Sequence, residues 1–295
     1  MSEITLFKIK PNVKKINGST CLIEKEIQTI IENNMFEFFG VTFLASEYAF
    51  DGGRMGSIGI DENNSPVIFE YKRTQNENVI NQGLYYLNWL LDHKDSFKLL
   101  VLEKLGKKIS DEIDWSIPRV LCIAGDFNKY DEQAIKQINR KVTLFRYRKY
   151  EDELIMFEQL NTNDVAPIAE EAGESSSSKR NDVTFSQNLD KAPEKFKLMY
   201  EDIKDYTLKL GDEVSFEPLK LYGAFKKISN FCSILVRQNK IVMHFKLDPT
   251  KYRDPSLRDV TNTGHWGTGN LELTITDESQ LEFAKKLIND AFNNN

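Results

Sequence analysis

The sequence contains few cysteines and histidines, and this scarcity excludes several kinds of site. Its 295 residues include three cysteines, which are far apart in the chain, and three histidines. Because no Cys-x-x-Cys pair or mixed Cys/His cluster is present, a zinc centre is not expected, and an odd, scattered set of cysteines does not build a disulfide framework. Each cysteine stands among apolar neighbours, which predicts buried, reduced thiols.

Long apolar runs are absent as well. No stretch approaches the roughly 18 consecutive apolar residues of a membrane helix, and the N-terminal sequence MSEITLFKIK has no apolar core of a secretory signal. We therefore expect no membrane partner and a cytoplasmic, reducing location. The chain also lacks an excess of positive charge, since its formal net charge is -6. A wholly basic surface is excluded, but a local basic cleft is not.

What the sequence does contain suffices for two domains. Hydrophobic residues make up 40% and charged residues 28% of the chain, as in globular proteins. The composition changes after residue 160, where the segment 161–192 includes the run AEEAGESSSSKRND. Such a run cannot bury enough apolar surface to offset its ordering entropy, which predicts a flexible linker. We expect one domain over 1–160 and a second over 193–295.

Hydrophobic periodicity and turn formers predict the elements of both domains. In the first, alternation of strands and helices indicates the α/β class, and Ser19 or Thr20 is the expected N-cap of the first helix. In the second, one helix, several strands and a closing helix indicate a small α+β domain. The expected helices are 19–34, 76–93, 97–105, 131–140, 193–210 and 278–292, and the expected strands are 4–9, 43–50, 55–61, 66–72, 119–124, 142–150, 154–160, 219–225, 231–236, 240–245 and 271–275.

Two charged side chains stand out on the apolar strand that ends in VIFEYK. Glu70 and Lys72 are separated by one residue, so both point to the same face of the strand. Burying them is costly unless they have partners or a function. The alternative is an edge strand with one solvated face and an incidental ion pair. Gln82 and Tyr86 are four residues apart and share a face of the following helix.

The E-x-K of Glu70–Lys72 and the Q-x-x-x-Y of Gln82–Tyr86 together resemble the PD-(D/E)xK nuclease superfamily, in particular its branch with the glutamine-tyrosine motif. The resemblance covers about residues 4–160 and implies a restriction-endonuclease-like fold, with a mixed sheet flanked by helices. The phrases FGVTFLASEY, NVINQGLYYLNWLLDHK and CIAGDFNKYDEQAIKQINR also resemble a family of uncharacterised bacterial proteins. The later phrases LYGAFKK and GHWG resemble the domain that accompanies such chains.

This resemblance implies metal-dependent hydrolysis of DNA phosphodiester bonds. An acid on a helix, an acid on a strand and Glu70 would bind Mg²⁺ or Mn²⁺ through oxygen atoms, and the metal would activate a water molecule. Lys72 would orient that water or help to deprotonate it. Gln82 and Tyr86 would support the metal shell or contact the DNA backbone.

The helix acid is Glu24 by the same resemblance. Glu26 is the rival, because both glutamates flank the apolar isoleucine face of the helix at similar angles. Helical geometry therefore does not choose between them. For each of the two, the alternative interpretation is an ordinary solvated glutamate.

The strand acid of the family pattern is missing. It belongs to a G-R-hydrophobic-D phrase, which here is GRMG and ends in Gly56. Asp61 has the wrong side-chain parity and lies roughly 16 Å away along an extended strand, Asp51 lies in the preceding loop without defined geometry, and Ser57 faces the other way. The missing acid predicts weak metal binding and little or no cleavage. Gly56→Asp is expected to restore activity if only this acid is lacking.

Basic side chains near the motif are candidates for contacts with DNA phosphates. Arg54 and Arg73 flank the E-x-K hairpin, and Arg146 and Arg148 alternate along one strand and so share a face. The alternative for the latter pair is a solvated strand face. Salt dependence of binding separates the two interpretations, since phosphate contacts release counterions.

A glycine-rich phrase, NTGHWGTG, marks the second domain. His265 and Trp266 stand between glycines, which indicates a tight loop whose backbone closely approaches another group. Trp266 is a candidate for stacking on a base or sugar, and His265 for binding a phosphate. The alternative is a structural loop with Trp266 packed into the core of the domain.

Three functions remain open. The chain is an active Mg²⁺-dependent DNA endonuclease that uses a substitute acid, a nuclease-derived DNA-binding protein with an impaired metal site, or a non-enzymatic protein-interaction scaffold. The E-x-K and Q-x-x-x-Y motifs favour the first two over the third, and Gly56 favours the second over the first. Nucleases of this fold often dimerise, so the resemblance also allows a homodimer.

Overall fold

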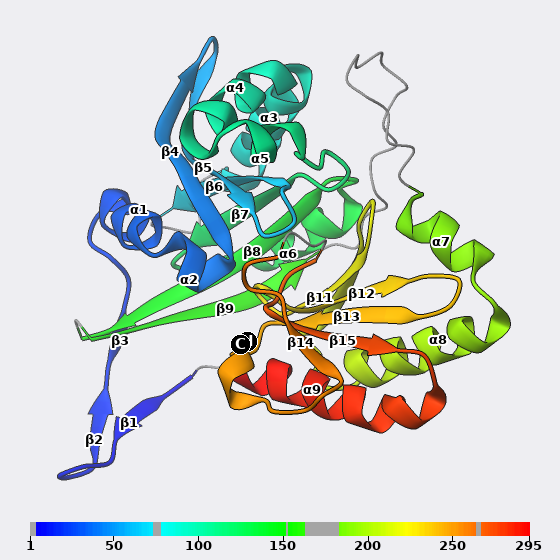
Figure 1. The fold of residues 1–295 in the computed structure, drawn as a ribbon. Coiled ribbons are helices and arrows are strands. Elements are labelled where there is room, and N and C mark those ends of the chain that lie inside the picture. Colours follow the sequence, from blue (N-terminus) through cyan, green and yellow to red (C-terminus); the bar gives the residue numbers. More distant parts are fainter. Residues whose placement is uncertain (1–3, 73–77, 152, 163–182, 264–266) are drawn as a thin grey trace. The chain divides into compact units, whose positions relative to one another are not determined.

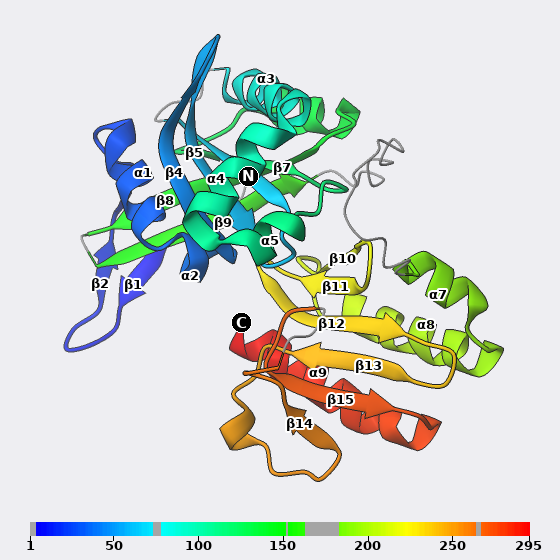
Figure 2. The same cartoon turned by 45° about the horizontal axis from the view of Figure 1, so that its top comes forward.

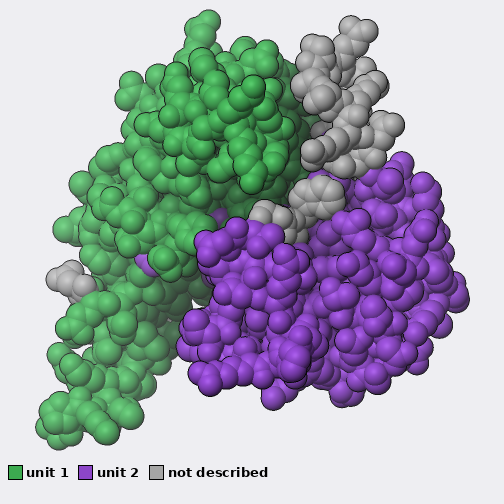
Figure 3. Space-filling model, in the orientation of Figure 1, with its two compact units in different colours: residues 1–37, 41–168 green, residues 38–40, 169–295 purple. Residues whose placement is uncertain are grey.

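The protein consists of two compact units (Figure 3). The computed structural model describes residues 4–72, 78–151, 153–162, 183–263 and 267–295. One unit comprises residues 1–37 and 41–168, and the other comprises 38–40 and 169–295. Each unit is described by itself below. Within the described ranges, no helix has the length and apolar character that crossing a membrane requires.

The first unit is built on a seven-stranded mixed sheet (Figure 1). The strand order is β3-β8-β7-β6-β5-β4, with β9 paired to β8 outside this path. Strands β6, β7 and β8 run parallel, and the other pairs are antiparallel. The bounds are β3 Gly18–Ser19, β4 Val41–Phe50, β5 Gly53–Asp61, β6 Pro66–Lys72, β7 Arg119–Ala124, β8 Lys141–Tyr150 and β9 Leu154–Thr162.

Helices flank this sheet. Ile68 and Val120 of the sheet share one buried cluster with Leu87 of α3 and Phe97 of α4, so these helices cover one face. Successive strand residues point to opposite faces, and Tyr71 belongs to a hydrogen-bond network that reaches α1 on the other face. The bounds are α1 Glu24–Asn33, α2 Met35–Phe39, α3 Val79–Asp92, α4 Lys94–Leu105, α5 Lys107–Asp111, α6 Lys129–Ala134 and the 3-10 turn η1 Ile135–Gln137.

The first helix begins later than predicted. Ser19 pairs with Lys149 as part of β3, and Ile23 is the N-cap of α1. The expected N-cap at Ser19 or Thr20 is therefore wrong, because sheet pairing outweighs the capping preference of serine. The apolar face is as predicted at Ile27, which is fully buried.

A short hairpin precedes the sheet of the first unit. Strands β1 Leu6–Lys8 and β2 Lys14–Ile16 pair antiparallel and form a two-stranded sheet of their own. Figure 1 shows this hairpin projecting from the rest of the first unit. It contains the short strand that was predicted over 4–9.

The second unit is a six-stranded antiparallel sheet with helices on one face (Figure 2). The strand order is β10-β11-β12-β13-β15-β14, and Met199 of α8 and Leu287 of α9 share a buried cluster with Ile234 and Met243 of the sheet. The bounds are α7 Phe185–Lys191, α8 Glu194–Leu208, β10 Ser215–Pro218, β11 Gly223–Lys226, β12 Asn230–Val236, β13 Ile241–Phe245, η2 Pro249–Lys251, β14 Leu257–Asp259, β15 Leu271–Ile275, η3 Glu278–Gln280 and α9 Leu281–Asn294.

The first described helix of the second unit lies inside the segment 161–192 that was predicted as linker. Thr184 forms a capping box with Gln187 at the start of α7. Phe185 is 3% exposed and contacts the ring of Tyr200 edge-on at 6.0 Å between centroids. An apolar anchor thus follows directly on the polar run, of which residues 163–182 lie outside the described part of the chain.

A second difference concerns the predicted strand 219–225. The chain turns over residues 219–222, with the N–H of Leu219 donating to the carbonyl of Tyr222, and strand β11 begins only at Gly223. Despite this local difference, the predicted fold class is confirmed, namely an α/β domain with a mixed sheet flanked by helices and a small α+β domain after it.

Because Phe185 is a buried anchor of the second unit, Phe185→Ala is expected to lower the unfolding free energy of that unit by about 3–5 kcal/mol, as for other large-to-small core changes. Denaturant unfolding followed by far-UV circular dichroism measures the change. Leu198→Ala on α8, where the side chain is 62% exposed, is the matched control and should change it by less than about 0.5 kcal/mol. Equal effects of the two substitutions would contradict the packing described for α7.

Candidate functional site

The E-x-K motif lies on the central strand of the first sheet. Strand β6 pairs with β5 on one side and with β7 on the other, so the interpretation of Glu70 and Lys72 as part of a solvated edge strand is wrong. Glu70 is 6% exposed, and the Lys72 side chain is 14% exposed. Both side chains therefore need partners within the protein.

The partner of Glu70 is a backbone N–H. The paired register of β5 and β6 ends at Ser57 opposite Phe69, so Gly56 lies just beyond the ladder. Its N–H donates to Glu70 Oε1 at 3.0 Å. The residue that stands at the position of the missing acid thus contributes a hydrogen-bond donor, where an aspartate would contribute a negative charge.

The environment of Glu70 favours its neutral form. The pKa of this carboxyl is raised from about 4.5 to about 7, mainly by burial; the Gly56 N–H and Lys72 oppose this rise, and the negative charges of Glu24 and Glu47 add to it. Desolvation is the largest of these effects, as expected for a carboxyl group on a central strand. Near neutral pH the carboxyl is therefore protonated in a substantial part of the molecules.

The structure distinguishes the two candidate helix acids. Glu24, the first residue of α1, places Oε2 3.5 Å from Lys72 Nζ. Glu26 instead pairs with Lys149 of β8 and accepts the N–H of Leu22, and these contacts lower its pKa. Glu24 is thus the glutamate beside the E-x-K motif.

The two residues of the Q-x-x-x-Y motif lie in different surroundings. Tyr86 is half-buried, and its pKa is raised by burial and by the nearby charge of Glu70. The backbone N–H of Arg54 hydrogen-bonds to Tyr86, which attaches α3 to the start of β5. Gln82 is exposed, one helical turn earlier. The structure thus brings Tyr86 to Glu70 and leaves Gln82 in contact with solvent.

A polar network between α1, β5 and β6, which the sequence analysis did not identify, lies next to the site. Gln28 of α1 is 4% exposed, and its Nε2 lies 2.9 Å from the carbonyl of Gly56 and 2.8 Å from Glu32 Oε1. Glu32 accepts from Ser57 Oγ at 2.6 Å, and Ser57 accepts from the Tyr71 hydroxyl at 2.9 Å. The signal for this network in the sequence was Gln28, a glutamine next to the apolar face of the predicted helix.

Glu47 is a second residue that sequence reasoning missed. It lies in β4 with φ of 50°, a conformation that non-glycine residues seldom adopt. Its Oε1 is 3.0 Å from Gln28 Nε2, and its Oε2 is 3.9 Å from Arg54 Nη1. Nothing in the local sequence indicates this backbone conformation, which directs an acid toward the site.

Asp61 has a structural role at the far end of the hairpin. It accepts the N–H groups of Asn63 and Ser65, each at 2.9 Å. It also pairs with Arg119, with Oδ2 3.2 Å from Nη2 and both side chains buried. Asp61 therefore closes the turn between β5 and β6. Asp51 is exposed in the turn between β4 and β5.

The space at Gly56 bears on the expected rescue by Gly56→Asp, which stays a prediction. A Cβ atom added there would lie 2.9 Å from the carbonyl oxygen of Phe69 and 3.1 Å from the ring of Tyr71. A backbone carbonyl cannot move aside as the end of a flexible side chain can. A side chain at position 56 would therefore displace the strand, and the substitution does not simply return an acid to the site.

The predicted basic cleft is only partly present. Arg54 is 63% exposed. Arg146, by contrast, is buried, with Nη1 3.4 Å from Asp126 Oδ1 and a further ion pair to Glu158, so its charge is neutralised within the fold. Arg148 donates to the backbone carbonyls of residues 125 and 147. The alternative of a solvated strand face is thus wrong for Arg146, which pairs with Glu158 of the neighbouring strand β9, and Arg148 is half-buried. Their predicted contact with DNA stays a prediction.

The remaining predicted site residues are Arg73, His265 and Trp266, which lie outside the described part of the chain. Beside the last two, Gly267 has φ of 100° and an added Cβ would lie 2.1 Å from Ser233 Oγ. This agrees with the expected close approach of a glycine backbone to another group.

Aromatic rings adjoin the site along α3. The ring of Phe50, at the end of β4, lies 4.5 Å from Trp89 and 5.7 Å from Tyr86 between centroids. Tyr85 is 52% exposed. All four rings keep exposed area, in contrast to the buried rings of the core. The spacing of Tyr85, Tyr86 and Trp89 in the phrase NQGLYYLNW was the signal available in the sequence.

These residues do not provide the metal site that the resemblance implies. Among the described residues, no group of three or more His, Cys, Asp or Glu side chains is placed to hold a metal ion. Of the three expected acids, Glu70 accepts the Gly56 N–H, Glu24 pairs with Lys72, and the strand acid is absent. The donor set is therefore one carboxylate short of the implied Mg²⁺ or Mn²⁺ site.

Comparison with known proteins identifies a family. The chain is 30% identical over 293 residues to an "Uncharacterized protein" of Haemophilus influenzae, an alignment that covers 96% of this chain and 97% of that protein. The chain belongs to the family of that protein. Residues 185–295 match the family described as "Domain of unknown function (DUF5655)". That match begins at the first residue of α7.

Two solved structures show a distant similarity. One is a repair endonuclease from Pyrococcus abyssi, with 14% identity, a TM-score of 0.28 and coverage of 47% of this chain and 59% of that chain. The other is EndoMS in its complex dsDNA2, with 17% identity, a TM-score of 0.27 and coverage of 48% of this chain and 59% of that chain. This chain thus spans less than two thirds of either solved chain.

The raised pKa of Glu70 predicts a pH-dependent stability. The folded state binds a proton that the unfolded state releases between about pH 4.5 and about pH 7, so the stability of the wild type falls as the pH rises through this window. Glu70→Gln keeps an acceptor for the Gly56 N–H and removes the titration. At pH 8 the variant is expected to be more stable by ~3 kcal/mol, at about 1.4 kcal/mol per pKa unit.

The measurement is denaturant unfolding in EDTA from pH 4 to pH 8, where the two proteins should converge at the acidic end. Glu103→Gln, on an exposed position of α4, is the matched control and should follow the wild type. A constant difference between Glu70→Gln and the wild type at all pH values would contradict the buried, neutral-favouring environment of Glu70.

Proposed function

We propose that this chain is a nuclease-derived DNA-binding protein of the PD-(D/E)xK type in which metal-dependent phosphodiester hydrolysis is impaired. The observation that carries the proposal is the 3.0 Å hydrogen bond from the Gly56 N–H to Glu70 Oε1. It places the glycine of the altered G-R-hydrophobic-D phrase directly beside the E-x-K glutamate. Glu70, Lys72 and Tyr86 of the two motifs lie together, and the acid that should complete them is replaced by a donor.

Hydrolysis is impaired because the site cannot concentrate negative charge. A divalent cation is held by several oxygen ligands, and each carboxylate must be ionised to serve as one. Burial raises the pKa of Glu70 to about 7, and Glu24 is paired with the ammonium group of Lys72.

DNA binding is supported by the groups around the motif. Arg54 is exposed at the start of β5, where its N–H bonds to Tyr86. The partly exposed rings along α3, of which Tyr85 is 52% exposed, offer flat apolar surface next to this charge. Arginine contacts phosphates, and aromatic rings stack on bases without requiring a particular sequence. The combination favours binding with little sequence preference.

Arg54→Ala is expected to weaken DNA binding and to make the slope of log K against log salt shallower by about one, as for the loss of one phosphate contact. Fluorescence anisotropy with a labelled oligonucleotide, over a range of salt concentrations, measures both quantities. Lys251→Ala in the second unit, where the side chain is 75% exposed, is the matched control. An unchanged salt slope for Arg54→Ala would remove this residue from the DNA contact.

In the same preparations, plasmid and single-stranded DNA should remain intact with Mg²⁺ or Mn²⁺. Metal-dependent cleavage that disappears in Lys72→Ala would overturn the proposed impairment. If such cleavage is observed, Glu47→Gln tests whether Glu47 is the acid that supports it. Its carboxylate lies close enough to raise the pKa of Glu70, and loss of cleavage in this variant would identify Glu47 as the substitute acid of an active endonuclease.

Gly56→Asp is expected to destabilise the first unit by about 1–3 kcal/mol, which is typical of overpacking, and to bring no metal-dependent cleavage. Gly56→Ala is the matched control, because it adds the same Cβ contact with the Phe69 carbonyl without the charge. Thermal unfolding and the plasmid assay measure the two outcomes. Cleavage by Gly56→Asp at wild-type stability would show that the strand accommodates the acid and that only this acid is missing.

A further inference from the structure

The β1–β2 hairpin, called here the arm (residues 4–16), differs in charge from the rest of the chain. The sequence has no acidic residue between positions 4 and 23, whereas the arm carries the lysines Lys8, Lys10, Lys14 and Lys15. The whole chain has a formal net charge of -6, so positive charge is concentrated in the arm. Such segregation is typical of segments that bind polyanions, nucleic acid in particular.

The lysines occupy both faces of the arm. Lys8 lies opposite Lys14 in the strand register, and Lys15 lies opposite Phe7 on the other face. Like charges directly opposite each other destabilise a strand pair, and a two-stranded hairpin is only marginally stable by itself. An anion that approaches the arm therefore relieves a repulsion built into it.

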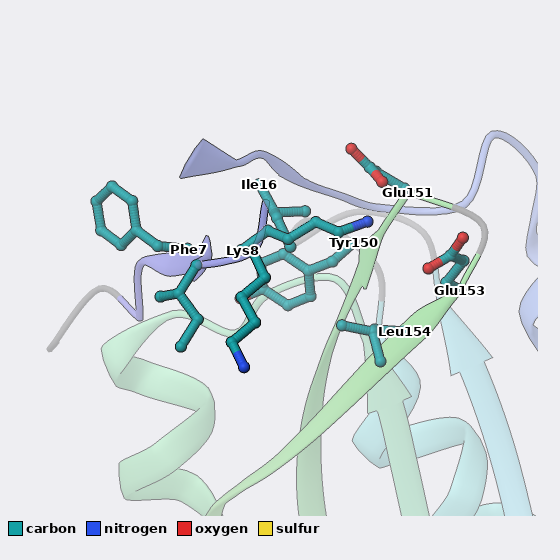
Figure 4. A pocket seen from close by; sticks show the side chains of 9 residues that line it. Phe7, Lys8, Ile16, Tyr150, Glu151, Glu153 and Leu154 are labelled. Atoms are coloured by element: carbon teal, nitrogen blue, oxygen red, sulfur yellow. The ribbon is translucent and has the colours of Figure 1, made fainter. Parts of the chain in front are cut away.

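Acidic side chains compensate only part of this charge. A groove of about 440 Å³ separates the arm from the turn between β8 and β9, and Glu151 and Glu153 line it on the side of the turn (Figure 4). Lys14 Nζ lies 3.6 Å from Glu151 Oε1, but both side chains are at least half exposed, so this pair is weak. Within the described ranges, the other three lysines of the arm form no salt bridge.

The arm leaves the sheet at the end that carries the E-x-K motif. Lys72 of β6 lies level with Ala124 of β7 and Arg146 of β8. Strand β8 continues to Tyr150, which pairs with Gly18 at the root of the arm, roughly 13 Å farther along the strand. Because one turn of duplex DNA spans about 34 Å, a duplex held at the motif can also reach the arm.

The distribution of apolar side chains favours nucleic acid over a lipid surface. Phe7 is 55% exposed, Ile9 71% and Val13 73%. A segment that lies on a bilayer separates its apolar face from its charged face, but Phe7 has Lys15 directly opposite on its own face. Mixed apolar and cationic side chains instead suit DNA, where bases and sugars adjoin phosphates.

We propose that the arm is a second DNA contact of the first unit, in which its lysines hold phosphates of the duplex and its exposed apolar side chains contact sugars and bases. A two-stranded ribbon is narrow enough to enter the major groove. This contact rests on the proposed function, since it presupposes that the unit binds DNA, and it adds a binding surface outside the E-x-K site.

Lys8→Gln/Lys15→Gln removes one positive charge from each face of the arm and should make the slope of log K against log salt shallower by about two. Fluorescence anisotropy with a labelled duplex of two helical turns measures the slope. Lys8→Arg/Lys15→Arg keeps both charges and should keep it. Lys107→Gln/Lys108→Gln, at exposed positions of α5, is the matched control and should also keep it. Circular dichroism melts verify that each variant is folded.

Comparison with Arg54→Ala separates the arm from the E-x-K site. A slope that changes in Arg54→Ala but not in Lys8→Gln/Lys15→Gln overturns the arm contact and leaves the proposed function in place. The reverse result supports the arm and removes the contact at Arg54. A wild type that binds no duplex rejects both.

Vesicles that contain phosphatidylserine test the lipid surface. The wild type should not bind them more tightly than vesicles of phosphatidylcholine alone. Binding to the anionic vesicles that falls in Phe7→Ser/Ile9→Ser, together with an unchanged DNA salt slope in Lys8→Gln/Lys15→Gln, would assign the arm to a membrane surface and reject the DNA contact.

Discussion

The buried carboxyl group of Glu70 is the constraint on which the site of the first unit depends. A carboxylate on a central strand loses its water and must be compensated by donors or by protonation. Here both occur, since the Gly56 N–H donates to it and its pKa rises to about 7. Strand β5 enters the β6 ladder only at Ser57, so the N–H of Gly56, just before it, is available. The positions of the residues around Glu70 follow from this local opening of the sheet.

Helix α1 is held against this opening by hydrogen bonds rather than by apolar contacts alone. Gln28 reaches the carbonyl of Gly56, and Glu32 accepts from Ser57. Buried polar groups that are fully bonded fix one arrangement of the elements that they join. The helix therefore meets the strand in a defined rotation, with Glu24 next to Lys72 and Glu26 directed at β8. The choice between these glutamates is decided by tertiary contacts that helical periodicity does not contain.

Features that depend on the local sequence were predicted, whereas features that depend on contacts between distant residues were not. The strand 119–124 has the predicted bounds, because a short β-branched run between turn formers is a local signal. The N-cap at Ser19 fails, since β8, more than a hundred residues away, recruits that residue into the sheet. Arg146 fails as a surface residue for a similar reason, because Glu158 of the neighbouring strand neutralises it. Hydrophobic periodicity predicted which helix or strand carries each motif residue. Strand pairing, which periodicity does not predict, determines which residues contact it.

The glycine at position 56 is better understood as one part of a consistent arrangement than as a lost ligand. An aspartate there would add a second carboxylate beside the N–H that binds Glu70, and two carboxylates in one site repel each other unless a cation lies between them or one is protonated. A glycine removes that repulsion, brings its N–H to the remaining acid and leaves room for the Phe69 carbonyl and the Tyr71 ring. Lys72 likewise finds its counter-charge in Glu24. Glu70 and Lys72 thus each have a partner within the protein.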